Sequence, residues 1–153
     1  MLIEDILKEK GRQIISINQK DSICDVLQLF TEKKIGSVIV MDDNEKIAGI
    51  ITEKDVLKCY RDAEKFDQLK IKDFMTPKEN LIIASYNDDI QYAMCMMTKH
   101  RIKHLPIFKD SQLFGIISIG DLIKAQLKQS QHTAKTYLDL LEGKTPQPDN
   151  EEF

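Results

Sequence analysis

The chain has 153 residues, 42% of them hydrophobic and 31% charged, with a formal net charge of -3. This is the composition of an ordinary globular protein, and the weak negative charge gives no basic field that would attract nucleic acid or anionic lipid. No run approaches the ~18 apolar residues of a membrane span, and no signal peptide opens the chain, so we expect a cytoplasmic protein that avoids membranes.

The three cysteines, Cys24, Cys59 and Cys95, form no CxxC pair. An odd number without a secretion signal argues against a disulfide framework or a zinc knuckle. We therefore predict small, buried or half-buried free thiols in a reducing compartment.

The first 60 residues contain a complete series of predicted elements. After the opening segment 3–7, residues 14–17 form a short extended run, and Ser22 with Asp25 resembles a capping box. An amphipathic helix follows, with its apolar residues at the spacing i, i+3, i+4 and i+7: Ile23, Val26, Leu27 and Phe30. Residues 35–41, a polar turn at 42–46 and a second apolar run predict a β-hairpin that ends in GIITEKD (49–55), before a second helix at 56–60.

The same series returns after a charged connector at 61–70. Segment 71–75 matches segment 3–7, residues 81–84 are extended, and Asp88 or Asp89 can cap a helix. That helix has its apolar residues at the same spacing: Ile90, Ala93, Met94 and Met97. A second hairpin, from residue 102, ends in GIISIGD (115–121), and a helix opens at Leu122. Pro106 lies within a predicted strand and cannot donate to a ladder, so we expect that strand to be an edge or bulged there.

Each unit reads strand, helix, strand, strand, helix, which predicts an α+β (mixed α/β) fold. Units of this size bury little core alone, so we expect two β-α-β-β-α repeats packed sheet to sheet with pseudo-twofold symmetry. The predicted boundaries are 2–60 for repeat 1, 61–70 for the connector, 71–127 for repeat 2, 128–142 for a C-terminal helix extension and 143–153 for a disordered tail.

The extended C-terminal helix carries more apolar residues than a closed repeat needs. They are Leu127, Tyr137, Leu138, Leu140 and Leu141. Exposed apolar stretches of this kind often mark association surfaces, so we predict a homodimer in which this helix takes part.

The doubled pattern resembles the tandem CBS (cystathionine β-synthase) pair, or Bateman module, of the free-standing type. The resemblance covers roughly residues 2–127 and rests on the paired GIITEKD and GIISIGD phrases, on IKDFMT at 71–76 and on RIKHLPI at 101–107. It implies a non-catalytic sensor without a catalytic cofactor. Its two clefts would bind AMP, ADP, ATP, an NAD-type dinucleotide or S-adenosylmethionine, and it would regulate a protein that the sequence does not name.

The resemblance also implies binding residues within the two phrases. Asp55 and Asp121 would accept hydrogen bonds from the ribose hydroxyls, since a carboxylate can accept from both. Alternatively, each Asp caps the helix that follows it. Thr52 and Ser118 would donate to a phosphate, or serve as helix-entry hydroxyls without a ligand.

Further candidates surround these pairs. Gly49 and Gly115 would admit a ligand or backbone closely, or form a bulge. The expected adenine slot is formed by Ile15 and Ile17 in one repeat and by Ile83 and Ala84 in the other, although all four also suit an ordinary core. Phosphate contacts are expected from Lys54, Lys103 and His104, or these are solvated surface charges. By the family's crossed geometry, Lys103 and His104 would serve the cleft of Asp55.

Other functions find little support. His100 and His104 are four residues apart, but the pattern changes from helix to strand between them, so no metal site is expected. No catalytic nucleophile motif, P-loop or dinucleotide glycine motif is present. Two hypotheses remain: a nucleotide-binding regulatory module, and a ligand-free dimerisation or adaptor protein that retains the fold.

Overall fold

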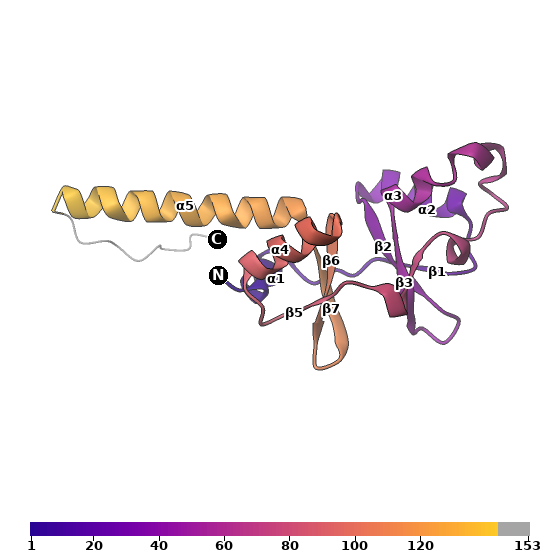
Figure 1. The fold of residues 1–153 in the computed structure, drawn as a ribbon, viewed down its shortest axis with the longest axis horizontal. Helices are drawn as coiled ribbons and strands as arrows, with labels where there is room; N and C mark the ends of the chain where they lie inside the picture. The colour runs from indigo at the N-terminus through magenta and orange to yellow at the C-terminus, as the bar shows by residue number, and fades with distance from the viewer. Residues whose placement is uncertain (144–153) are drawn as a thin grey trace.

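The computed structural model describes residues 1–143, which form two β-sheets with helices packed on them (Figure 1). The α-helices are α1 (Ile3–Lys10), α2 (Ile23–Lys33), α3 (Glu53–Leu57), α4 (Ile90–His100) and α5 (Ile119–Leu141), and the 3-10 helices are η1 (Tyr60–Lys65), η2 (Ile71–Asp73) and η3 (Lys78–Asn80). The strands are β1 (Ser16–Asn18), β2 (Ser37–Met41), β3 (Ile47–Thr52), β4 (Thr76–Pro77), β5 (Ala84–Ser85), β6 (His104–Lys109) and β7 (Gln112–Ser118). The order β-α-β-β-α occurs twice, as predicted.

The first sheet has the order β1-β2-β3-β4. β1 runs parallel to β2, and a parallel pair requires a crossover, which α2 supplies. The predicted capping box fixes the start of α2, because Ser22 Oγ accepts the Asp25 N–H at 3.1 Å while Asp25 Oδ2 accepts the Ser22 N–H at 2.9 Å. The core beneath this sheet consists of Ile23, Val26, Phe30, Val38, Val40, Ile51, Val56, Cys59 and Ile71.

The second sheet repeats the arrangement with the order β5-β6-β7. Its crossover helix α4 is capped by Asp89, whose Oδ1 accepts the Gln91 N–H at 2.8 Å. The core of this half consists of Ile3, Ile6, Leu7, Ala84, Ile90, Ala93, Met97, Leu105, Ile107, Ile117 and Leu122. In Figure 1 the two sheets lie in the middle of the two-repeat body, with α4 and α1 on one side and α2 and α3 on the other.

The segment that precedes each repeat in sequence packs on the other repeat. Helix α1 lies in the second core, where the Ile3 N–H donates to the Asp88 carbonyl at 2.9 Å. Conversely, Ile71 is buried in the first core, and β4 pairs with β3. This exchange links the two repeats through backbone hydrogen bonds as well as through apolar contacts.

Gly49 and Gly115 make room for these exchanged segments. A Cβ on Gly49 would overlap the Thr76 carbonyl oxygen, and one on Gly115 would lie 3.0 Å from Leu7 Cδ2. In both hairpins the register also shifts beside the glycine, so each flanks a β-bulge. At Gly49 the backbone of Thr76 comes close to the glycine, as expected. At Gly115 the neighbour is the side chain of Leu7 instead of backbone.

We predicted that Pro106 lies in an edge strand or in a bulged strand. The prediction of an edge strand is wrong. β6 is the central strand of its sheet, and Pro106 is buried opposite Ile116. The proline is tolerated because β5 is only two residues long and pairs with Ile107 and Phe108, beyond Pro106. The expected bulge lies next to it, between Ile107 and Phe108.

The first strands of the two repeats are later and shorter than predicted. The extended runs at 14–17 and 81–84 contain β1 at Ser16–Asn18 and β5 at Ala84–Ser85. The cysteine expectation holds for Cys59, which is buried. Cys24 and Cys95 are exposed because they fall on the outer faces of α2 and α4.

Helix α5 continues the second repeat and then runs away from it (Figure 1). It ends at Leu141, close to the predicted limit of 142, and Gly143 follows with a φ of 71°. The predicted tail at 143–153 lies outside the described residues from 144 onward. Within residues 1–143, no helix combines the length and the apolar character that crossing a membrane requires.

Candidate functional site

The junction between β3 and α3 holds Thr52 and Asp55 together. Asp55 Oδ2 accepts the Thr52 N–H at 3.0 Å and the Thr52 hydroxyl at 3.1 Å, and the Asp55 N–H lies 3.4 Å from Thr52 Oγ1. Asp55 is only 5% exposed, and Oδ1 faces Lys58 Nζ at 3.2 Å. Asp55 therefore takes part in helix capping, but not as the N-cap residue that the alternative predicted. The helix starts at Glu53, Thr52 is its N-cap, and Asp55 completes the capping box from the third helical position.

The junction between β7 and α5 repeats this arrangement with Ser118 and Asp121. Asp121 Oδ2 accepts the Ser118 N–H at 2.7 Å, and Ser118 Oγ accepts the Asp121 N–H at 3.2 Å. Here the carboxylate also receives Lys10 Nζ at 2.6 Å, and the same ammonium donates to the Ile116 carbonyl at 3.1 Å. Burial of the carboxyl raises the pKa of Asp121, but the hydrogen bonds from Lys10 and Ser118 outweigh it, and the net shift is downward.

Lys10 was not among the predicted site residues. The signal in the sequence is its helical spacing, because Lys10 follows Ile3 by seven positions and so shares a face with Ile3, Ile6 and Leu7. That face packs on the second repeat. A lysine at the end of a buried stripe places its ammonium at the edge of the contact, which here is the Asp121 junction.

His104 lies where the two repeats meet. It opens β6 opposite Ser118, and a Cβ on Gly36 would lie 3.3 Å from His104 Cε1. Burial lowers the pKa of His104, and the surrounding charges of Glu53, Lys10, Asp121 and Lys103 partly offset one another. The side chain is therefore close to the start of α3 in one repeat and to Asp121 in the other.

The remaining predicted polar residues are more exposed. Lys103 is exposed, and its carbonyl accepts the Ile119 N–H at 2.9 Å, which anchors the start of α5. Lys54 is exposed in the first turn of α3. In the described part of the chain, neither ammonium group makes an ion pair or a side-chain hydrogen bond.

The four predicted adenine-slot residues differ in burial. Ile15 and Ile17 are half-buried against the first core, and Ala84 is buried within the second. Ile83 is 45% exposed, so it presents apolar surface that the core does not use.

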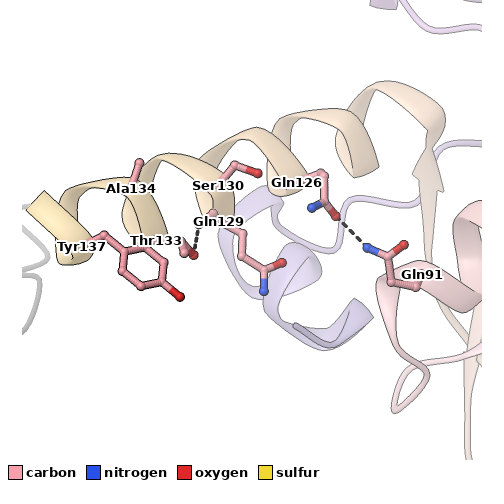
Figure 2. Close-up of a pocket in the computed structure, with 7 residues that line it drawn as sticks. All are labelled: Gln91, Gln126, Gln129, Ser130, Thr133, Ala134 and Tyr137. Atoms are coloured by element: carbon pink, nitrogen blue, oxygen red, sulfur yellow. Dashed lines mark hydrogen bonds between the residues drawn. The ribbon is translucent and has the colours of Figure 1, made fainter.

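A shallow hollow lies along α5, and none of the predicted site residues lines it (Figure 2). Gln91 of α4 donates to Gln126 Oε1 at 2.8 Å at one end of it, and Thr133 and Tyr137 lie toward the other end. Within residues 1–143, no group of three His, Cys, Asp or Glu residues is placed to hold a metal ion.

A duplicated β-α-β-β-α unit with a hydroxyl–aspartate junction in each copy defines a tandem-repeat module. Its sequence matches the CBS domain over residues 3–62 and 71–128. The chain belongs to the CBS-domain family.

Individual relatives agree with this assignment. The chain is 29% identical over 148 residues to a mitochondrial CBS domain-containing protein, CBSX3 of Arabidopsis thaliana, an alignment that covers 92% of this chain and 72% of the relative. Among solved structures, the CBS-domain protein ATU1752 of Agrobacterium tumefaciens superposes with a TM-score of 0.77 at 32% identity, covering 82% of this chain and 92% of that one.

A second solved structure shares the fold. The CBS domain pair of the protein MJ0100, in complex with 5′-methylthioadenosine and S-adenosyl-L-methionine, superposes with a TM-score of 0.70. The alignment covers 82% of this chain and 98% of that one, at 24% sequence identity.

Proposed function

We propose that this chain is a non-catalytic regulatory module that binds an adenosine nucleotide at its two hydroxyl–aspartate junctions and signals to a separate protein in the cytoplasm. The observation that carries the proposal is the duplication of the junction, with Thr52 and Asp55 in one repeat and Ser118 and Asp121 in the other. A single junction would be explained by helix capping alone. Two copies, each at the meeting of a strand and a helix, suit two ligand sites of the same design.

Ribose hydroxyls fit the unused capacity of these carboxylates. Capping occupies Oδ2 of each aspartate, whereas Oδ1 of Asp55 faces only the ammonium of Lys58, whose side chain is 61% exposed. A carboxylate oxygen accepts more than one hydrogen bond, so capping and ribose binding are compatible. The pair structure of MJ0100 supports an adenosine ligand in this fold, since it holds two such compounds.

The other parts of a nucleotide have candidate partners nearby. Thr52 and Ser118 can donate to a phosphate, and Lys54, Lys103 and His104 can supply positive charge to it. The apolar surface of Ile15, Ile17, Ile83 and Ala84 suits a flat adenine ring. Because His104 lies beside Gly36 and Glu53 of the first repeat, it is the residue best placed to contribute across the repeats.

A thermal-shift panel of AMP, ADP, ATP, NADH and S-adenosylmethionine tests the proposal. A ligand that binds the folded state at about 100 times its Kd adds about 2.7 kcal/mol to the free energy of unfolding, which raises the Tm by several degrees. We expect at least one member of the panel to raise the Tm, with GMP as the control that lacks adenine. A panel without any shift would refute the proposal.

One observation favours the second candidate function, a dimerisation or adaptor protein without a ligand. On α5 the side chains of Ile123, Leu127, Tyr137 and Leu141 are each at least half exposed, and with Ser130 and Ala134 they recur at alternating steps of four and three. This is the spacing of a coiled-coil seam. A second copy of the chain would therefore dock here with or without nucleotide.

A further inference from the structure

Lys10 connects the N-terminal helix to the Asp121 junction. Its ammonium bridges two acceptors, Asp121 Oδ2 at 2.6 Å and the Ile116 carbonyl at 3.1 Å, across a sequence separation of 111 residues for the first contact. The side chain of Asp121 is 23% exposed and that of Lys10 is 42% exposed. The contact is therefore at a solvent-accessible edge, where a ligand can compete for it.

Within residues 1–143, no cation from another element pairs with Asp55. Its lysine, Lys58, is the residue that caps the C-terminal end of the same short helix, three positions after Asp55, and it contacts Oδ1 rather than the capping oxygen Oδ2. The residue aligned with Lys10 in the segment before the second repeat is Lys78, which is exposed in η3 and for which the described structure shows no ion pair with Asp55. The two junctions therefore differ in how their aspartates are neutralised.

We propose that Lys10 makes the Asp121 junction selective for anionic adenosine ligands, that is, for nucleotides over uncharged or cationic adenosine compounds. The proposal rests on the proposed function, because it assumes that Asp121 receives the ribose.

The selectivity follows from an exchange of partners. Ribose hydroxyls and the Lys10 ammonium are both donors, so a ligand that engages Asp121 competes with Lys10 for the carboxylate. The displaced ammonium can keep the Ile116 carbonyl but loses its anionic partner, and a phosphate on the ligand supplies a new one in a charge-assisted hydrogen bond. Adenosine or 5′-methylthioadenosine offers no such acceptor, and the sulfonium of S-adenosylmethionine repels the ammonium. His104 is near this contact, since the charges of both Lys10 and Asp121 affect its pKa.

AMP and adenosine form the matched pair of ligands that tests this, since they differ in the phosphate alone. Calorimetry should be run with both on the wild type, on Lys10→Met and on Lys8→Met. Lys8 lies on the same helix and pairs with Glu4, so its variant loses one lysine without touching Asp121. We expect Lys10→Met to weaken AMP about tenfold, the range of one charge-assisted hydrogen bond, and to tighten adenosine, which no longer competes with the ammonium. Lys8→Met should change neither.

The same comparison in an Asp121→Ala background assigns the effect to this junction, because the influence of Lys10 should disappear there. If Asp121→Ala does not fold, the Lys10→Met variant alone tests the proposal, through the predicted opposite changes in its affinities for AMP and adenosine. Equal losses for both ligands would mean that Lys10 only supports the fold, and an unchanged ratio of their affinities would also overturn the selectivity. If the wild type binds neither ligand nor any nucleotide of the panel, the proposed function fails and this proposal with it.

Discussion

Asp55 caps the helix with one carboxylate oxygen, and the other faces the exposed side chain of Lys58. Its burial together with a complete set of capping bonds explains why a charged residue is tolerated at 5% exposure. A variant at this position therefore removes both a cap and the proposed ribose acceptor. Separating the two effects requires a control that removes a cap alone.

Asp55→Ala should weaken the binding of the best adenine nucleotide by about ten- to a hundredfold, equivalent to ~1.4–2.8 kcal/mol. It should also lower the free energy of unfolding by about 1–2 kcal/mol through the lost capping box. Calorimetry and urea unfolding measure the two quantities.

Asp25→Ala is the matched control for this experiment. Asp25 makes the same capping box with Ser22 at the start of α2, so its loss should cost similar stability and leave the nucleotide Kd unchanged. An Asp55→Ala protein that binds as tightly as the wild type would contradict the ribose assignment.

His104 should make stability depend on pH. Because burial lowers its pKa in the folded state, the unfolded chain, with a His pKa of about 6.5, takes up the proton more readily. Stability is thus fully present above about pH 6.5 and falls as the pH drops toward the lower folded pKa. Melting curves between about pH 7.5 and pH 5.5 should show a smaller loss of Tm for His104→Gln than for the wild type.

The exposed His100 on α4 provides the comparison for this experiment. His100→Gln should retain the wild-type slope of Tm against pH. The charged groups around His104 are Glu53, Asp121, Lys10 and Lys103. A slope that survives in His104→Gln would mean that a group other than His104 titrates.

At the scale of elements, α5 and α1 contribute more than their own repeat requires. α1 contributes to the second core, and α5 carries an exposed apolar seam. The outer part of α5 extends away from the two repeats (Figure 1). Isolated helices are marginal in water, and most helical stability in proteins comes from packing of an apolar face. Because the outer part of α5 has an apolar face that nothing in its own chain covers within residues 1–143, we expect a second copy of the chain to pack against it.

Leu127→Glu should weaken self-association, because it places a charge in the middle of the seam. Sedimentation velocity over a concentration series should show a dimer for the wild type and a shift toward monomer for the variant. Gln131→Glu adds the same charge to an exposed position of α5 outside the seam and should leave the dimer intact. A wild type that sediments as a monomer would remove the prediction, and a dimer unaffected by Leu127→Glu would place the interface elsewhere.

At the scale of the whole molecule, the exchange of flanking segments joins the two repeats into one folding unit. Each core contains residues that precede the other repeat, so neither core is complete without both halves of the chain. We expect a single cooperative unfolding transition, as in other small domains, because neither core can form alone.

Glycine substitutions test this exchange directly. Gly49→Ala should lower the free energy of unfolding by about 1–3 kcal/mol, since its Cβ would overlap the backbone of β4, which cannot yield without breaking its pairing with β3. Gly115→Ala should cost less, because its Cβ meets the flexible end of Leu7.

Gly120→Ala is the control variant, for which we expect no loss in the free energy of unfolding. Its Cβ would make an ordinary contact at 3.6 Å with Ser118 Oγ, and alanine favours a helix over glycine. Urea unfolding should rank the variants with Gly49→Ala least stable and Gly120→Ala at least as stable as the wild type. Equal stability of Gly49→Ala and the wild type would show that β4 is not held against β3.

The sequence by itself determined the duplicated order of elements, the Ser22 cap and the two hydroxyl–aspartate phrases, and it narrowed the second cap to Asp88 or Asp89. These features are local: apolar spacing and capping residues act within a few positions along the chain, so they can be interpreted without knowing the tertiary structure. The tertiary structure decided the exchange of α1 and β4 between repeats, the central place of Pro106, the position of His104 beside Gly36, and the contact of Lys10 with Asp121. These depend on pairs far apart in sequence, where burial of apolar faces brings a side chain to a partner that no local pattern specifies.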